Sequence, residues 1–343
     1  MVLPLSIPSP SAAWANFNFG QWLRDIGLTW FPYDVNIRAY AVCILVGIVV
    51  ATIMTARRLR NRGADGGVVL DIALWAVPLG IIGARVFHVL THPDDYFGPG
   101  KDLLKTLYIW EGGIAIFGAL IGGAIGAYIG CRIAGVRFWS FADALAPGLL
   151  LAQAFGRFGN YFNHELFGVP TNLPWGLEIE SSNPAFPAGL PSGTLFLPTF
   201  LYEIIWNVAG VLLILFLEHR FTLQWGKVFA LYLIWYGIGR SYLESVRIDP
   251  SLIFLGVRTN VWASWAAIVV GLVILIVQAR RHPGLEPSVY LPGREWSPTP
   301  AVDSEDTYSD IDDDGNEAGL VTTTVSGSPK AEKSVTSGAG PQP

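Results

Sequence analysis

The residues between Gly156 and Gly168 combine several polar side chains with glycines, directly after a long apolar run. Lipid disfavours an ionisable group at the bilayer centre, so such groups at membrane depth are functional candidates by default. A guanidinium stays protonated and can hold a phosphate through two parallel hydrogen bonds. The stretch therefore indicates chemistry on an anionic headgroup. The alternative is a structural knot at a helix end, in which Arg157 pairs with Glu165. The polar members are Arg157, Asn160, Asn163, His164 and Glu165.

A second constellation lies further along, where Tyr236, Arg240, Glu244 and Arg247 are spaced by four, four and three residues. This spacing places all four on one face of a helix. Near a membrane interface such a face should turn toward the bundle interior. The alternative is an architectural set of salt bridges between helices. Further polar residues interrupt other apolar segments, among them Tyr40, Arg85 and Glu203.

The composition indicates a membrane protein. Of the 343 residues, 52% are hydrophobic and only 14% are charged, whereas soluble domains carry about 25% charged residues. Apolar runs of membrane-spanning length recur along the chain. We therefore predict an all-α polytopic membrane protein with seven transmembrane helices and a sizeable extracytoplasmic loop region. The predicted spans are 39–56, 71–91, 112–131, 140–156, 199–217, 228–246 and 261–279.

Basic residues follow alternate predicted spans. Cytoplasmic loops are enriched in Lys and Arg, so this pattern predicts an extracytoplasmic N-terminus and a cytoplasmic C-terminus. The segment 1–38 is rich in Trp, Phe and Tyr, which suits an extracytoplasmic or interfacial position. The loop 157–198 carries many prolines, so we expect packing to order it, or the loop to lie over a site. The basic residues are Arg57, Arg58, Arg60, Arg62, Arg132, Arg137, Arg220, Lys227, Arg280 and Arg281.

The last part of the chain differs in composition from the rest. Residues 283–343 hold 11 acidic and 3 basic residues, a net charge of −8, against −5 for the whole chain. The remainder is therefore at +3, which suits an anionic lipid partner; the alternative is that positive cytoplasmic loops alone account for this charge. We predict a disordered acidic cytoplasmic tail over 283–343 and a transmembrane catalytic domain over 39–282.

These motifs resemble those of the bacterial prolipoprotein diacylglyceryl transferase family. The signature G-R-x-G-N-[FYW]-x-N-x-E-x-x-G matches Gly156 to Gly168, and Trp-Glu-Gly-Gly at 110–113, Leu-Tyr-Glu at 201–203 and the 236–247 pattern agree with it. The resemblance covers roughly 30–280. It implies a seven-span enzyme of the bacterial cytoplasmic (inner) membrane. That enzyme transfers the diacylglyceryl group of phosphatidylglycerol to the lipobox cysteine of a prolipoprotein and releases glycerol phosphate. No metal or organic cofactor and no nucleic-acid partner are implied.

The resemblance also implies roles for matching residues. Arg157 and Arg240 match essential arginines, and Tyr236 matches a tyrosine implicated in activity. We add His164 as a candidate base, because an unperturbed pKa near 6.5 suits that role; the alternative is an incidental loop residue. The expected substrate-binding and lipid-binding positions are Tyr40, Arg85, Asn160, Asn163, Glu165, Gly168, Glu203, Glu244 and Arg247.

One position departs from the pattern. Many family members have a His after the Trp-Glu-Gly-Gly element, and that His is a proposed general base; here the matching residue is Phe117. A Phe cannot accept a proton, so either the base is dispensable or another group replaces it. Two other functions stay open at this point. A transporter or channel also lines its interior with Arg, Glu and Tyr, and a catalytically silent homologue would bind lipid or precursor only.

Overall fold

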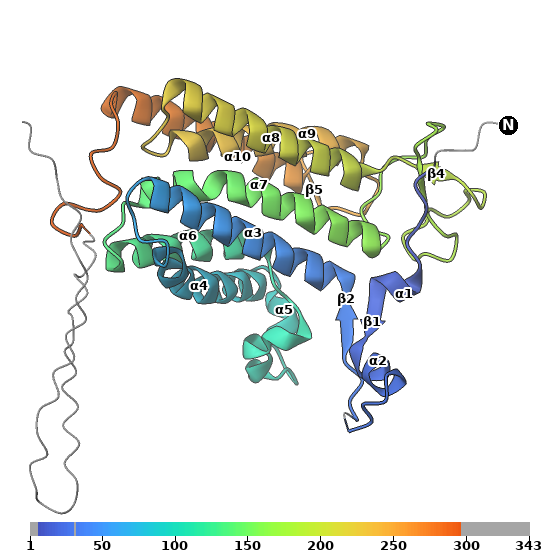
Figure 1. Ribbon diagram of the computed structural model, residues 1–343. Coiled ribbons are helices and arrows are strands. Elements are labelled where there is room, and N and C mark those ends of the chain that lie inside the picture. The colour runs from blue at the N-terminus through green and yellow to red at the C-terminus, as the bar shows by residue number, and fades with distance from the viewer. Residues whose placement is uncertain (1–5, 31, 296–343) are drawn as a thin grey trace, which may run out of the picture. The chain divides into compact units, whose positions relative to one another are not determined.

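Seven long helices lie side by side in a bundle (Figure 1) in the computed structural model, which describes residues 6–30 and 32–295. Six of the predicted spans each lie within a longer helix, whereas the predicted span 112–131 begins four residues before α6 and ends within it. Their bounds are α3 Ala39–Asn61, α4 Val68–Thr91, α6 Ile116–Ile133, α7 Phe138–Phe162, α8 Thr199–Phe221, α9 Lys227–Val246 and α10 Thr259–Arg281.

Short elements occupy the connections. An antiparallel pair with Asn16 opposite Arg38 leads into α3, and two further pairs lie in the loops before α8 and α10. These elements are α1 Ala12–Ala15, β1 Asn16–Asn18, α2 Phe19–Asp25, β2 Asn36–Arg38, α5 Pro93–Tyr96, η1 Leu103–Leu107, η2 Ile109–Glu111, β3 Leu177–Glu178, β4 Leu195–Phe196, β5 Ile253–Phe254 and β6 Val257–Arg258.

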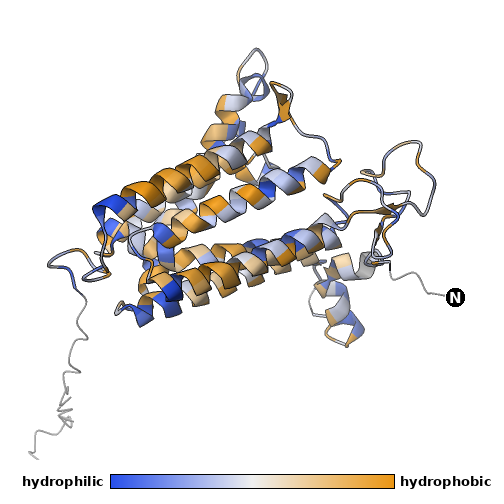
Figure 2. Cartoon of the chain, turned by 90° about the horizontal axis from the view of Figure 1, so that it is seen from above, coloured by the Kyte–Doolittle hydropathy of each residue, from blue (hydrophilic) through white to orange (hydrophobic). Residues whose placement is uncertain are grey.

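Six of the seven helices are long and apolar enough to cross a bilayer: α3, α4, α6, α7, α8 and α10. Their surfaces are mainly hydrophobic along their length (Figure 2). The protein is therefore a polytopic helical membrane protein, as predicted. The helix α9 falls outside this set, although it packs along α10 within the bundle. Its second half carries the polar stripe of Arg240 and Glu244, which interrupts its apolar sequence.

Glycines bring α4 and α6 into close contact. The residues Gly118, Gly122, Gly126 and Gly130 recur every four positions of α6 and are all buried. A Cβ atom added at Gly122 would lie 2.2 Å from the carbonyl oxygen of Leu79 on α4. Small residues at membrane helix interfaces allow backbones to approach in this way. This small-residue pattern therefore packs α6 tightly against α4.

The helix α7 is the centre of the bundle, since α3, α8 and α9 all pack against it. Near its start, the buried carboxylate of Asp143 accepts the backbone N–H groups of Gly226 at 2.8 Å and Phe229 at 2.9 Å. These donors belong to the first turn of α9, whose free N–H groups otherwise lack partners. Asp143 thus fixes the start of α9 on α7, and so helps to set the register of the polar stripe.

The helix α7 continues to Phe162, six residues beyond the predicted end of the fourth span. The first half of the signature is therefore helical, not loop. The chain that follows, up to α8, has its own apolar cluster around the fully buried Phe196. Packing orders this loop, as predicted.

The predicted boundary of the acidic tail at 283 is too early. Val289 and Tyr290 are buried in a core cluster with residues of α3, α4, α6 and α7. The hydroxyl of Tyr290 accepts the N–H of Asp65 at 3.0 Å. Residues 283–295 therefore belong to the folded unit, because they cover the end of the bundle with apolar side chains. The rest of the predicted tail lies outside the described residues.

Candidate functional site

Arg157 lies on the last turns of α7, where the signature begins. Its Nε is 2.5 Å from Oε2 of Glu203 on α8, and its Nη1 donates to Oδ1 of Asn160 at 2.9 Å. The Asn160 amide in turn donates to Glu165 at 2.8 Å, and Asn163 donates to the same oxygen at 3.2 Å. The predicted Arg157–Glu165 pair is therefore indirect. Asn160 joins the two, and Glu203 is the direct partner of Arg157.

Arg240 approaches the same carboxylate from α9. Its Nη1 lies 3.9 Å from Oε1 of Glu203, and its Nη2 lies 2.9 Å from Oε2 of Glu244 one turn further on. One carboxylate of α8 thus faces arginines from α7 and α9 on its two oxygens. The predicted stripe of α9 does turn toward the bundle interior.

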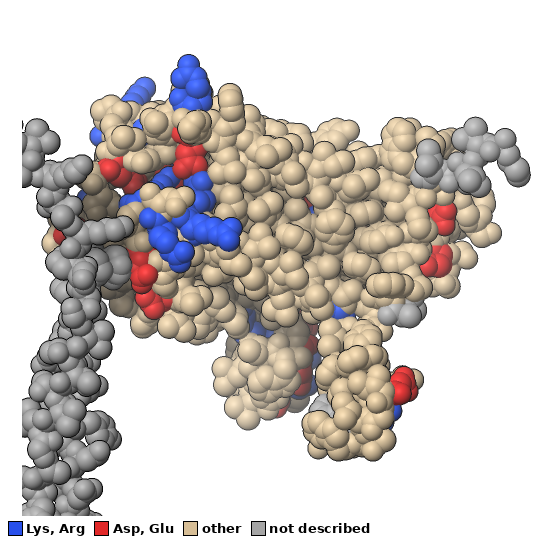
Figure 3. Space-filling model, viewed as in Figure 1, with Lys and Arg blue, Asp and Glu red and all other residues tan. Residues whose placement is uncertain are grey.

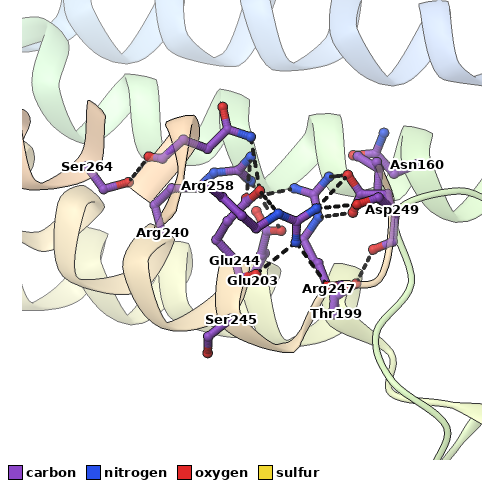
Figure 4. A network of polar contacts seen from close by, with 12 residues as sticks. Asn160, Thr199, Glu203, Arg240, Glu244, Ser245, Arg247, Asp249, Arg258 and Ser264 are labelled. Atoms are coloured by element: carbon purple, nitrogen blue, oxygen red, sulfur yellow. Dashed lines mark hydrogen bonds and ion pairs between the residues drawn. The ribbon is translucent and has the colours of Figure 1, made fainter. Parts of the chain in front are cut away.

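The fully buried carboxylate of Glu244 joins this stripe to the loop before α10 (Figure 4). Arg247 is 3.6 Å away, Arg258 is 3.3 Å away, and Asn260 donates at 3.0 Å. Asp249 pairs with Arg247 at 2.7 Å. We call the whole group the arginine cluster: Arg157, Glu203, Arg240, Glu244, Arg247, Asp249 and Arg258.

The arginine cluster holds four arginines and three carboxylates, so one formal positive charge remains. Buried charges are tolerated only where opposite charges and hydrogen bonds compensate them. Here the compensation is incomplete: within the described part of the chain, Nη1 of both Arg240 and Arg247 is buried without a hydrogen-bond partner. Such orphaned donors suit a site that accepts an anion.

A small enclosed cavity of about 20 Å³ lies against the two facing arginines. This volume holds about one water molecule. Arg157 is five residues, and Arg240 six residues, before the end of its helix. At a rise of 1.5 Å per residue, these two arginine side chains leave their helices roughly 8 Å before the helix ends, measured along the helix axis. The cavity is lined by Gln153, Arg157, Glu203, Trp206, Asn207, Tyr236, Gly239, Arg240 and Leu243.

His164 does not line this cavity. It follows α7 in a left-handed conformation with φ of 52°, and its Nδ1 contacts Glu180 at 2.8 Å and the Ser9 hydroxyl at 3.4 Å. Burial raises the pKa of Glu180, but hydrogen bonds from its backbone, His164 and Ser9, together with the His164 charge, outweigh burial and hold that pKa below its usual value. His164 therefore belongs with Ser9 and Glu180 in the hydrogen-bonded contacts of the loop after α7, and not with Arg157 and Arg240.

Arg85 also lies elsewhere. Its guanidinium donates to the carbonyl oxygens of Thr106 at 2.8 Å, Gly112 at 2.8 Å and Gly113 at 3.0 Å, and also to that of Lys105. These bonds fasten the loop before α6 onto α4. Main-chain carbonyls thus take most of the donors of Arg85, which also lines a mainly apolar cavity against α4. That Arg85 binds lipid stays a prediction. Phe117, at the start of α6, packs against Phe87 with ring centroids 6.1 Å apart and does not line the cavity.

Tyr40 and Gly168 support the site from outside the cavity. A Cβ atom at Gly159 would lie 2.6 Å from the Tyr40 ring, so that ring packs directly on the signature helix. Gly168 forms a backbone bridge with Arg247, and a Cβ there would lie 2.8 Å from Cβ of Leu197. Gly168 thus allows the signature loop to approach the end of α9.

Sequence reasoning missed Arg258 and Asp249 in the cluster, and Gln153 and Asn207 at the cavity. The first two join the cluster only because the loop after α9 folds back through the β5–β6 pair. Their spacing along the chain carries no signal of this contact. The signal for Gln153 and Asn207 is that they are polar residues within apolar helices.

Comparison with known proteins shows the family of this chain. A family described as prolipoprotein diacylglyceryl transferase matches residues 29–277, a range that contains the cavity and the whole arginine cluster. The chain belongs to this family. The resemblance predicted from the motifs is thereby confirmed, and the protein is a transferase rather than a transporter or channel.

Several relatives agree along most of their length. The chain is 63% identical to a phosphatidylglycerol–prolipoprotein diacylglyceryl transferase of Leifsonia xyli over 310 residues, covering 88% of this chain and 90% of the relative. It is 48% identical to an enzyme named phosphatidylglycerol–prolipoprotein diacylglyceryl transferase 2 of Streptomyces coelicolor, covering 76% and 81%. A phosphatidylglycerol–prolipoprotein diacylglyceryl transferase of Paenarthrobacter aurescens is 48% identical, and the match covers 72% of this chain and 80% of the relative.

Proposed function

We propose that the protein transfers the sn-1,2-diacylglyceryl group of phosphatidylglycerol to the thiol of a prolipoprotein lipobox cysteine, the first step of bacterial lipoprotein maturation. Family membership supports this reaction class. The observation that carries the proposal in this chain is the meeting of Arg157 and Arg240 on Glu203, beside an enclosed cavity within apolar helices.

In this proposal, the Glu203 carboxylate occupies the position that the lipid phosphate takes when it binds. The carboxylate lies between the two guanidiniums, and a phosphodiester offers the same kind of anionic oxygens. The cavity holds about one water molecule, so a headgroup enters only when Glu203 withdraws from at least one arginine. The orphaned Nη1 of Arg240 is then a donor ready for a phosphate oxygen.

The reaction forms a bond between the cysteine sulfur and glycerol carbon C3, and breaks the bond between C3 and the phosphate oxygen. The bonding electrons leave with that oxygen, so glycerol phosphate departs as an anion. Fixed cations at this oxygen stabilise the charge that develops in the transition state. Arg157 and Arg240 take this role in our proposal, and Tyr236 on the cavity wall orients the headgroup.

The thiol proton passes to water in this scheme. A thiolate is the nucleophile, and cationic surroundings lower the pKa of a thiol from about 8.5. Neither His164 nor Phe117 lines the cavity, so the scheme uses no histidine base. The substrate cysteine belongs to the precursor, and Cys43 and Cys131 of this chain take no part.

The remaining predicted residues take supporting roles in the proposal. Asn160, Asn163 and Glu165 hold Arg157 in position through their hydrogen bonds. Glu244 and Arg247 hold Arg240 and the loop before α10. Tyr40 and Gly168 shape the wall of the signature helix and loop.

We further propose that α9 is the seventh span, in the bacterial cytoplasmic membrane. Its polar stripe faces Glu203 of α8 and the loop before α10, so these charged side chains lie inside the bundle and away from lipid. Basic residues lie at the ends of α3, α6, α8 and α10 and at the start of α9. That end is cytoplasmic by the positive-inside rule, and the arginine cluster therefore faces the extracytoplasmic side.

The deciding experiment uses membranes containing the protein, phosphatidylglycerol labelled in its acyl chains, and a lipobox peptide. Label should appear on the peptide thiol with the natural protein and vanish with Arg240→Ala. An Arg60→Ala variant is the matched control, because Arg60 is exposed at the other end of the bundle. If the folded natural protein binds phosphatidylglycerol but transfers no label, it is a silent homologue, and Phe117 marks the lost catalytic position.

A further inference from the structure

A second cavity lies at the opposite end of the bundle from the arginine cluster, where α3 and α8 end. Its volume is about 440 Å³, and its walls include Arg58, Arg62, Glu218, Gln224 and Leu285. Lys and Arg gather at this end of the molecule (Figure 3). The cavity shares no residue with the transferase site, so its purpose needs a separate explanation.

Arg58 is fixed at the cavity wall by the bundle itself. Its Nε donates to the carbonyl oxygen of Ala144 at 3.0 Å, and its Nη2 to that of Asp143 at 3.0 Å. Its Nη1 lies 2.8 Å from Oε2 of Glu218. The guanidinium is therefore held in one orientation before any ligand arrives, and such preorganisation reduces the entropic cost of binding.

Arg62 is the C-cap residue of α3, one turn beyond Arg58, and is only partly satisfied. Its Nη2 is 2.7 Å from Oε1 of Glu218, but its Nη1 is buried and has no hydrogen-bond partner among the residues that the structure describes. A single carboxylate thus forms the ion pairs of both guanidiniums, and the buried Asp143 is a further acidic residue near Arg62. A purely architectural ion pair between α3 and α8 would need neither the second arginine nor the open cavity beside it.

Apolar surface continues from this cavity along α8. Leu215 lines the cavity, and on the same helix Leu212 and Phe216 are 65% and 63% exposed. Both α3 and α8 pack on α7 with one face. Acyl chains can therefore lie along the opposite, outer faces of these helices while a headgroup enters the cavity. Basic pockets between helices at a membrane surface are suited to anionic lipid headgroups.

We propose that this cavity binds the headgroup of an anionic phospholipid from the leaflet at the basic end of the bundle. The Arg62 guanidinium turns toward the cavity so that its buried Nη1 donates to the phosphate. Glu218 remains the protein's own counter-ion for Arg58, and the acyl chains follow the apolar face of α8. This site is separate from the lipid that the transferase consumes, and the proposal does not depend on the reaction.

The test is native mass spectrometry of the full-length protein titrated with phosphatidylglycerol or phosphatidylcholine. Arg62→Gln removes the guanidinium that would hold the phosphate, so the number of tightly bound phosphatidylglycerol molecules should fall by one, with affinity for that molecule down about tenfold. Arg60→Gln is the matched control: it removes the same charge from the same helix, but Arg60 does not line the cavity. That control should bind as the natural protein does.

Glu218→Gln tests the proposal with the opposite sign, and it decides the matter if Arg62→Gln fails to fold. Without the competing carboxylate, phosphatidylglycerol should bind more tightly, whereas a structural ion pair predicts lower stability and unchanged binding. Equal binding in Arg62→Gln and the natural protein, or equal binding of phosphatidylcholine, overturns the proposal. Competition by inorganic phosphate at millimolar concentration that displaces the bound lipid completely overturns the assignment to a lipid.

Discussion

Glu203 is the carboxylate that a bound phosphate must displace, because it lies between Arg157 and Arg240. In a Glu203→Gln variant the arginines lose their anionic partner, and breaking a buried pair costs about 3–5 kcal/mol of stability. Phosphatidylglycerol should restore much of this loss by supplying a new anion. We therefore expect the lipid to raise the melting temperature of Glu203→Gln more than that of the natural protein. Glu178→Gln, in the loop outside the cavity, should respond as the natural protein does. A lipid-induced shift no larger in Glu203→Gln would contradict displacement.

Arg157 divides its donors between two partners in different directions, and a lysine cannot reproduce this fork. We expect Arg157→Lys to lower kcat/KM for transfer at least tenfold, since a hydrogen bond to a charged group contributes about 1.5–3 kcal/mol. Arg24→Lys is the control, because Arg24 pairs with Asp34 in the exposed N-terminal segment. Transfer assays with labelled lipid measure both variants. Near-normal activity of Arg157→Lys would show that a point charge suffices.

At the scale of the helix, α4 can pack closely on α6 because glycine has no side chain at the contact positions. A methyl group at Gly122 would meet the Leu79 carbonyl at 2.2 Å, whereas one at Gly123 finds its nearest neighbour, a carbonyl of Ala76, at 3.8 Å. We expect Gly122→Ala to destabilise the protein by about 1–3 kcal/mol and Gly123→Ala to leave its stability nearly unchanged. Thermal unfolding in detergent compares these neighbours directly. Equal melting temperatures would mean that the two helices can separate without cost.

The sequence predicted the helices well, since runs of apolar residues have few alternatives in a membrane. It also placed Arg240 and Glu244 on one face of α9, because helical spacing is fixed. The sequence did not predict contacts that depend on how loops fold back onto the helix bundle. The sequence suggests that Arg85 is a ligand at membrane depth, yet four carbonyls of a nearby loop take its donors. Glu203 as the direct partner of Arg157 was equally invisible, because no pattern states which helices are neighbours.

The whole folded unit extends past the last helix, and this extension predicts how truncations behave. Removal of residues 283–343 would take away the buried side chains of Val289 and Tyr290 and the bond from Asp65 to the Tyr290 hydroxyl. Burial of one large apolar side chain contributes about 1.5–3 kcal/mol, so a chain that ends at 282 should lose several kcal/mol of stability. A chain that ends at 296 keeps both buried side chains and this hydrogen bond, and it should melt with the full-length protein.

The same two truncated chains show whether residues 283–295 affect stability alone or catalysis as well, because Val289 and Tyr290 pack at the opposite end of the bundle from the arginine cluster. We expect the chain ending at 282 to retain normal kcat at low temperature and to lose activity on mild heating. Tyr290→Ala in the full-length protein should reproduce most of this sensitivity, at about 3–5 kcal/mol for loss of a large buried aromatic. Unfolding curves and transfer assays on the same preparations measure both properties. A chain ending at 282 that is as heat-resistant as the full-length protein would mean that residues 283–295 cover the bundle without stabilising it.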